Sequence, residues 1–212
     1  TRTIRFKYIP NYTGAPGGAV VYGLFHIGAG PGANSNSSIS FLHNAVGTLT
    51  LRLRGSDGLL KYNAVPTSGG NWLPVAGTTY EFEVNVDCSG TARVFIDGAL
   101  YGTATYSSYT RLAADITEIY IGTGEAHTEV SNADYGSVLL FSSIQHTAAY
   151  TPSALPGYQY AISDPTIVLT TGTDSLSIDD YSEVSSATSP AALGRIVLID
   201  DALKWSNSGV LA

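Results

Sequence analysis

Polar and apolar residues alternate along much of the chain, and this alternation is the clearest structural signal in the sequence. It runs through residues 3–9 (TIRFKYI), 48–54 (TLTLRLR) and 80–87 (YEFEVNVD). Successive side chains of a β-strand point to opposite faces, so each segment is predicted to be a strand with one buried and one solvated face.

Further apolar segments predict strands at residues 20–27, 38–44, 118–124 and 137–143. Clusters of Gly, Pro, Asn and Ser separate them, and no segment longer than a turn or two has a helical period. Many short strands joined by glycine-rich turns indicate an all-β fold, here a two-sheet antiparallel jelly-roll sandwich.

Two β-hairpins are predicted from paired strand segments with an acidic tip. Residues 93–103 read RVFIDGALYGT, and an Asp-Gly pair between two strands is typical of a type I′ turn. We therefore interpret Asp97 as a turn residue and not as a catalytic one. Residues 196–205 (IVLIDDALKW) repeat the design with Asp200 and Asp201 at the tip, and form the predicted C-terminal hairpin.

The composition changes at residues 150–158 (YTPSALPGY), after which Ser, Thr and Asp become frequent. We predict a sandwich domain at 1–156, and at 157–212 an extended appendage or the start of a small following β domain. The appendage is expected to pack on the sandwich or on a neighbouring chain. Because the sequence begins at Thr1 and contains no Met, we expect it to be a piece of a longer polypeptide.

The composition also excludes several classes of function. Only 13% of the residues are charged, the net charge is −7 and no basic run occurs, so nucleic-acid binding is not expected. A single cysteine, Cys88, forms no internal disulfide and no thiolate metal site. No apolar run approaches the ~20 residues of a membrane span, and no signal-peptide pattern is present.

Four segments in a fixed order resemble a known family. Residues 71–87 carry a Trp before a Gly-Thr turn into a strand. The FIDG hairpin at 95–98, the IYIG strand at 119–122 and a segment at 136–152 that begins with the closing strand follow in this order. This order resembles laminin-G-like members of the concanavalin A-like lectin/glucanase superfamily, of the kind found in phage virion and bacterial surface proteins, over about residues 1–152. The resemblance implies a jelly roll; it does not fix the function, because the superfamily includes lectins, adhesion modules, virion proteins and glycosidases.

No catalytic motif is found, and we predict no catalytic residue. Glycoside hydrolysis needs two carboxylates across the sugar. The nearest match is Glu81, Glu83 and Asp87 on one face of a strand, which we interpret as a solvated strand face. The scattered histidines are expected to be packed or exposed and not to bind a metal; they are His26, His43, His127 and His146.

Two kinds of binding site remain as hypotheses. Many relatives bind calcium at the rim of the sandwich, and Asp134, Asn132 and Asp115 are the candidate oxygen ligands here; turn or cap roles for them stay open. A glycan site would use aromatic rings and planar polar groups. The candidate residues, for which core or solvated roles also stay open, are Tyr101, Tyr106, Tyr109, Tyr135, Arg52 and Arg54.

We therefore hypothesise a non-catalytic attachment module of a larger extracellular, cell-surface or virion protein. Its expected partners are a cell-surface glycan or receptor and the neighbouring subunits of a fibre or particle, including further copies of the chain. The alternative is a polysaccharide-cleaving enzyme, a hydrolase or lyase, on the same fold.

Overall fold

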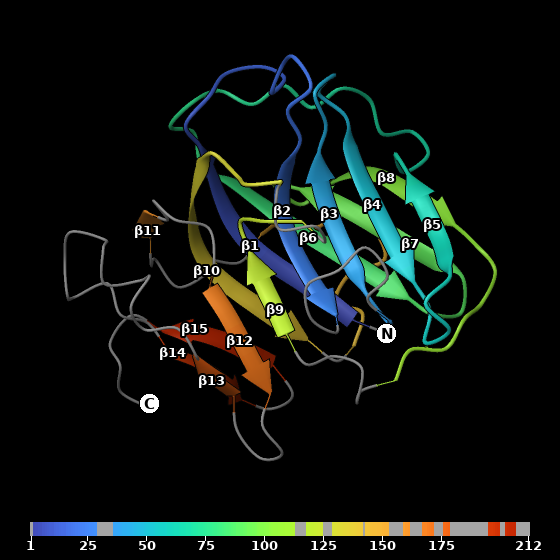
Figure 1. Cartoon of the computed structure of the whole chain (residues 1–212). Coiled ribbons are helices and arrows are strands. Elements are labelled where there is room, and N and C mark those ends of the chain that lie inside the picture. Colours follow the sequence, from blue (N-terminus) through green and yellow to red (C-terminus); the bar gives the residue numbers. More distant parts are fainter. Residues whose placement is uncertain are drawn as a thin grey trace.

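A computed structural model describes residues 2–28, 36–112, 118–124, 129–141 and 143–152, together with the backbone of five C-terminal strands between residues 159 and 206. The described strands form two antiparallel sheets that pack face to face (Figure 1). The predicted all-β jelly-roll sandwich is therefore confirmed.

Sheet A is built around the N-terminal strand. Its spatial order is β14 (Arg195–Ile199), β15 (Ala202–Ser206), β10 (Ala133–Phe141), β1 (Arg2–Pro10), β6 (Tyr80–Asp87), β7 (Thr91–Ile96) and β8 (Ala99–Thr105), while β11 (Gln159–Ala161) also pairs with β10. Sheet B has the order β13 (Leu176–Ile178), β12 (Ile167–Thr171), β9 (Glu118–Ile121), β2 (Tyr22–Gly28), β3 (Ile39–His43), β4 (Leu49–Arg54) and β5 (Leu60–Ala64).

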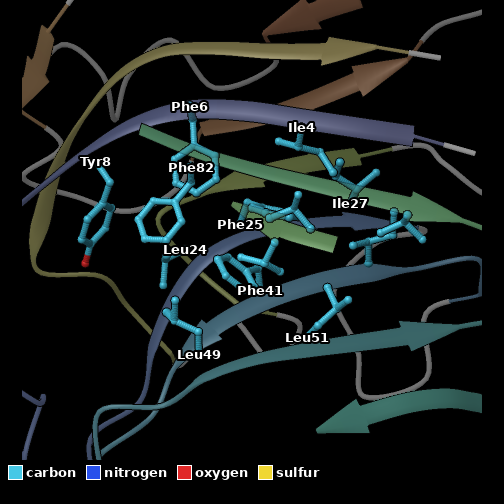
Figure 2. Packing of buried hydrophobic residues seen from close by; sticks show 14 of the residues in the cluster. Ile4, Phe6, Tyr8, Leu24, Phe25, Ile27, Phe41, Leu49, Leu51 and Phe82 are labelled. Carbon is cyan, nitrogen blue, oxygen red and sulfur yellow. The ribbon is translucent and has the colours of Figure 1, made fainter. Parts of the chain in front are cut away.

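The core lies between the sheets and is rich in aromatic rings (Figure 2). Phe6 of β1 stacks on Phe82 of β6 at 5.3 Å, and it forms a T-shaped pair with Phe25 of sheet B at 5.7 Å. These inward residues occupy alternate strand positions, so burial of their apolar area is what fixes the register of each strand.

The outer face of sheet A corrects one prediction. Glu81 and Glu83 do point away from the core, but they are buried, with Glu83 fully inaccessible. The interpretation as a solvated strand face is wrong because residues 143–152 lie across this face. Thr3 on β1 donates a hydrogen bond to the carbonyl of Ser143 (2.8 Å), and Asn85 on β6 donates one to the carbonyl of His146 (2.8 Å).

A buried ionic network joins segment 143–152 to strands β1 and β6. Arg5 donates through Nη2 to Glu81 Oε1 (2.6 Å), and its Nε lies 3.5 Å from Glu83 Oε2. Glu83 also accepts from Asn85 Nδ2 (2.7 Å) and pairs with His146 Nδ1 (2.8 Å). We call these five residues the outer-face network. A buried charge is tolerated when partners of this kind surround it.

The Asp97–Gly98 turn receives the far end of the same segment. Asp97 and Gly98 have positive φ values of 51° and 77°, which confirms the predicted turn role for Asp97. The carbonyl of Gly98 accepts from the backbone N–H of Tyr150 (2.9 Å), and the Tyr150 ring stacks on His146 at 3.6 Å. The hairpin thus acts as a docking point for the chain that leaves β10.

The C-terminal strands extend both sheets. In sheet A, β15 pairs with β10, and in sheet B, β12 pairs with β9. Ladder pairing of β14 with β15 confirms the predicted second hairpin, although Asp200 and Asp201 at its tip lie outside the described residues. The domain boundary after residue 156 stays a prediction. No helix in the described part of the chain is long and apolar enough to cross a bilayer.

Candidate functional site

A row of polar side chains crosses the outer face of sheet B. Backbone pairing places one residue from each of five adjacent strands in the same row: Tyr120, His26, Ser40, Arg52 and Asn63. Tyr120, His26, Ser40 and Arg52 are each flanked along their strands by buried core residues, so these four point outward. Asn63, the exposed partner of Arg52 on β5, completes the five. We call them the sheet B row.

The sheet B row is buried at the end that contains His26 and Ser40 and reaches solvent at Arg52 and Asn63, which we call its open end. His26 Nδ1 lies 2.8 Å from the hydroxyl of Ser40, and both side chains are buried. At the open end Arg52 is half-buried and Asn63 exposed, and Arg52 Nε donates to Asn63 Oδ1 over 3.4 Å. The open end therefore offers a guanidinium and an amide side by side, both planar and able to hydrogen-bond to hydroxyls or carboxylates.

Two further cations lie at the turn between β4 and β5. Arg54 donates to the carbonyl of Gly58 (3.0 Å), and Lys61 pairs with Asp57 at 2.6 Å. The hydrogen bond from Lys61 holds the pKa of the Asp57 carboxyl below its usual value. With Arg52 included, three cations and one carboxylate gather at this edge of a chain whose net charge is −7.

The predicted tyrosines Tyr106 and Tyr109 lie together at another edge. Their rings are 5.6 Å apart, and Tyr62 of β5 lies 6.0 Å from Tyr106. Tyr106 donates to the carbonyl of Asp87 (2.9 Å), and burial raises the pKa of both Tyr106 and Tyr109. The pair packs residues 106–112 against the sandwich and offers only part of each ring to solvent.

The other two candidate tyrosines, Tyr101 and Tyr135, make contacts within the fold. Tyr101 donates to the carbonyl of Gly70 and accepts from the backbone N–H of Leu49 (3.4 Å). Tyr135, a candidate for glycan binding, lies within β10, and its ring is buried in the core 5.2 Å from that of Tyr8. It faces inward because it shares the strand face of Ala133, and so it is not part of any exposed site.

The candidate calcium residues supply few oxygen ligands in the part of the chain that the structure describes. Asp134 is half-buried on β10 and Asn132 is exposed just before it, while Asp115 lies outside the described residues. Calcium takes 6–8 oxygen ligands, and two side chains do not make such a site. In the described part of the chain no group of three or more His, Cys, Asp or Glu side chains could hold a metal. A rim calcium site stays a prediction.

A chain of hydrogen bonds at one end of the sandwich contains His43. The His43 Nδ1 atom accepts from the Tyr12 hydroxyl (2.7 Å), because Nε2–H donates to the carbonyl of Trp72 (3.1 Å). The Tyr12 hydroxyl in turn lies 3.1 Å from that of Tyr8. His43 is buried, which is one of the two alternatives expected for it, and burial lowers its pKa from 6.5 to about 4.

This lowered pKa predicts that His43 makes stability depend on pH. The unfolded chain binds a proton near pH 6.5 and the folded chain only near pH 4, so the free energy of unfolding falls as the pH drops through this window. We expect the loss to reach about 2–3 kcal/mol at pH 4. Urea unfolding at pH 7 and pH 4.5 measures it, and His43→Gln should show a smaller drop between the two pH values. An equal drop would contradict the role of His43.

Comparisons with known proteins were made on both sequence and structure. No family model and no curated protein matches the chain. Similar solved structures include the CBM40 of the Ruminococcus gnavus IT-sialidase, which is 18% identical with a TM-score of 0.42 over 64% of this chain and 70% of that one. A SAP-like pentraxin from Limulus polyphemus is 16% identical with a TM-score of 0.48, over 68% of this chain and 65% of that one.

The receptor binding domain of botulinum neurotoxin type G is also similar in structure. It is 11% identical with a TM-score of 0.47, and the match covers 68% of this chain and 35% of that one. At these identities and scores the comparisons carry no argument about the site, which rests on this chain's own residues. The laminin-G-like character stays a resemblance.

Of the sheet B row, the sequence predicts Arg52 alone as a binding residue. Arg52 and Arg54 were expected on a polar strand face, because they alternate with leucines in residues 49–54. His26, Ser40 and Asn63 join Arg52 only through the pairing of four strands. No local pattern specifies which positions become neighbours across a sheet, so nothing in the sequence could have found them.

Proposed function

We propose that the chain is a non-catalytic binding module that holds a glycan on the outer face of sheet B. The observation that carries the proposal is the open end of the sheet B row, where Arg52 and Asn63 lie side by side. Sugar hydroxyls are recognised by a few fixed, planar donors and acceptors of this kind. Arg54 and Lys61 border the same place and enlarge the polar surface.

The charges favour an acidic sugar as the ligand. Arg52, Arg54 and Lys61 outnumber the one carboxylate, Asp57, whereas the chain as a whole is negative. A guanidinium binds a carboxylate or sulfate through paired, charge-assisted hydrogen bonds that are stronger than those to a neutral hydroxyl. We therefore expect glycans with carboxylate or sulfate groups to bind more tightly than their neutral counterparts, and added salt to weaken the binding.

The arrangement of carboxylates supports binding over hydrolysis. Strands β2, β3, β4 and β5, which form most of the outer face of sheet B, contain no Asp or Glu. The Glu81 and Glu83 pair lies on the other sheet, where it is buried under segment 143–152 and held by Arg5. A hydrolase needs two carboxylates that reach the substrate. Release of reducing sugar from a broad polysaccharide panel would support the enzyme alternative instead.

The experiment that tests the proposal has two steps. A glycan array of neutral, carboxylated and sulfated oligosaccharides identifies the best ligand, and calorimetry then compares the native chain with Arg52→Ala. We expect the variant to bind at least about tenfold more weakly, since a charge-assisted contact contributes about 1.5–3 kcal/mol. Arg93→Ala, on the outer face of sheet A, is the matched control and should bind as the native chain does. No array signal, or equal binding by both variants, would contradict the proposal.

A glycan ligand indicates where the module acts. Glycans are displayed on cell surfaces and in the surrounding matrix, so we propose that the chain acts outside the cell, as part of a surface protein or a virion. The low charged fraction of 13% supports contact with uncharged surfaces of neighbouring subunits as well. Attachment of a larger particle through many weak glycan contacts would suit such a module.

A further inference from the structure

The single cysteine of the chain, Cys88, is half-buried in the turn between β6 and β7. Residues 106–112 fold back over this turn, and the backbone N–H of Tyr109 donates to the carbonyl of Cys88 (3.0 Å). The Tyr109 hydroxyl lies beside the Cys88 sulfur, and the guanidinium of Arg111 interacts electrostatically with the same sulfur. The thiol is therefore placed against one hydroxyl and one cation.

Two polar atoms beside Cys88 are buried donors that have no hydrogen-bond acceptor. They are Nη2 of Arg111 and the hydroxyl of Tyr109. A thiol sulfur is only a weak acceptor and does not replace an oxygen. A buried donor without an acceptor is costly, and folded proteins leave few of them. Two at one place indicate that an oxygen acceptor binds or forms between them.

The charge of Arg111 also lacks compensation. Its Nε donates to the carbonyl of Ser37 (2.7 Å), which fixes the guanidinium but adds no negative charge. Among the residues that the structure describes, no carboxylate forms an ion pair with Arg111, and burial lowers its pKa. A buried cation is tolerated when an anion or several acceptors surround it. The acceptor that fits this place therefore carries an oxygen with high electron density.

We propose that Cys88 is an oxidation site, and that Arg111 and Tyr109 hold the oxygen that is added to its sulfur. The oxidant is a hydroperoxide. The sulfur attacks the terminal oxygen of the hydroperoxide, so an S–O bond forms and the O–O bond breaks. The sulfur loses two electrons and becomes a sulfenic acid, while the leaving oxygen takes up the thiol proton and departs as an alcohol or as water.

The surroundings of Cys88 favour retention of this sulfenic acid. A second thiol normally consumes a sulfenic acid by forming a disulfide, and the sequence contains no second cysteine. The half-buried position restricts the approach of a thiol from another molecule. Because the new oxygen meets two buried donors, oxidation should stabilise the fold. A polar group added without such donors around it would destabilise the fold.

Thermal unfolding of the 212-residue chain before and after treatment with hydrogen peroxide tests the proposal. Intact mass measures the gain of one oxygen atom, which cannot come from methionine because the sequence contains none. A dimedone adduct then identifies the sulfenic acid at Cys88. We expect the oxidised chain to unfold about 3–6 °C above the reduced chain, since one charge-assisted hydrogen bond predicts a rise of this size.

Four variants separate this contact from a general effect of peroxide, each compared in its reduced and oxidised forms. Tyr109→Phe removes one donor and should show a smaller rise, and Arg111→Met should lose most of it. The matched control is Tyr62→Phe, because the Tyr62 hydroxyl already has an acceptor, the carbonyl of Val65 (2.9 Å); it should show the native rise. Cys88→Ala should gain no oxygen and show no rise.

An oxidised chain that unfolds at or below the temperature of the reduced chain would overturn the proposal. A native chain that gains no oxygen at Cys88 would overturn it too, as would a rise that Tyr109→Phe leaves unchanged. A disulfide-linked pair of chains as the only product would also count against it, because that product requires a sulfur that points away from Arg111. If Arg111→Met does not fold, the comparison of Tyr109→Phe with Tyr62→Phe decides.

Discussion

Replacement of Glu83 by alanine is expected to lower the free energy of unfolding by about 3–5 kcal/mol, because it removes one partner from a buried charge network. Glu83 is fully buried and contacts Arg5, Asn85 and His146. Without it, Arg5 keeps only Glu81 as a carboxylate partner, and the amide of Asn85 loses one of its two acceptors. Such a loss is a large part of the 5–15 kcal/mol that typically stabilises a domain.

Urea unfolding of the native chain and of Glu83→Ala measures the difference. Asp57→Ala is the matched control, since this carboxylate also pairs with a cation but on the solvated surface, where ion pairs contribute little. We expect the control to unfold close to the native chain and Glu83→Ala at a much lower urea concentration. Equal midpoints for the two variants would contradict the buried network.

Replacement of Gly98 by alanine is expected to destabilise the fold by about 3 kcal/mol through two separate effects. Gly98 has φ of +77°, and a Cβ there would lie 2.0 Å from the carbonyl oxygen of Tyr150 and 2.8 Å from Pro152 Cδ. The left-handed backbone costs about 1 kcal/mol for a residue with a side chain. The clash then moves segment 143–152 away and breaks the bond from Tyr150 N–H to the Gly98 carbonyl.

Gly77→Ala separates the two effects, because Gly77 has nearly the same φ, +75°, with nothing within 4 Å of its Cβ position. Gly77→Ala should lose only the energy of the left-handed backbone. Its free energy of unfolding, measured by heat or urea, should therefore be about 2 kcal/mol higher than that of Gly98→Ala. If the two variants are equally stable, segment 143–152 does not dock on the hairpin.

The strands that are half-buried could be predicted from the sequence, since burial on one face imposes the alternation that the chain shows. Strand β5 has no such pattern: Leu60 is exposed and Tyr62 half-buried, because β5 lies at the edge of sheet B. Edge strands bury little area on either face, so selection for burial leaves only a weak trace in them.

Whether the polar face of a strand is solvated or covered could not be predicted in the same way. Alternation in residues 80–87 correctly placed Glu81 and Glu83 opposite the core, but it contains no information on what covers them. The cover is segment 143–152, about sixty positions later in the chain, and its contacts arise from tertiary packing. For the same reason Arg52 could be proposed from the sequence while its neighbours His26 and Ser40 could not.

The central claim is that a glycan binds at the open end of the sheet B row, and backbone NMR of the isotope-labelled chain tests it most directly. The chain is titrated with the oligosaccharide that gives the strongest array signal. We predict that the amide shifts that change with ligand concentration lie in Ile39–His43, Leu49–Arg54 and Leu60–Ala64. Changes confined to residues 106–112, or none at saturating ligand, would contradict the account.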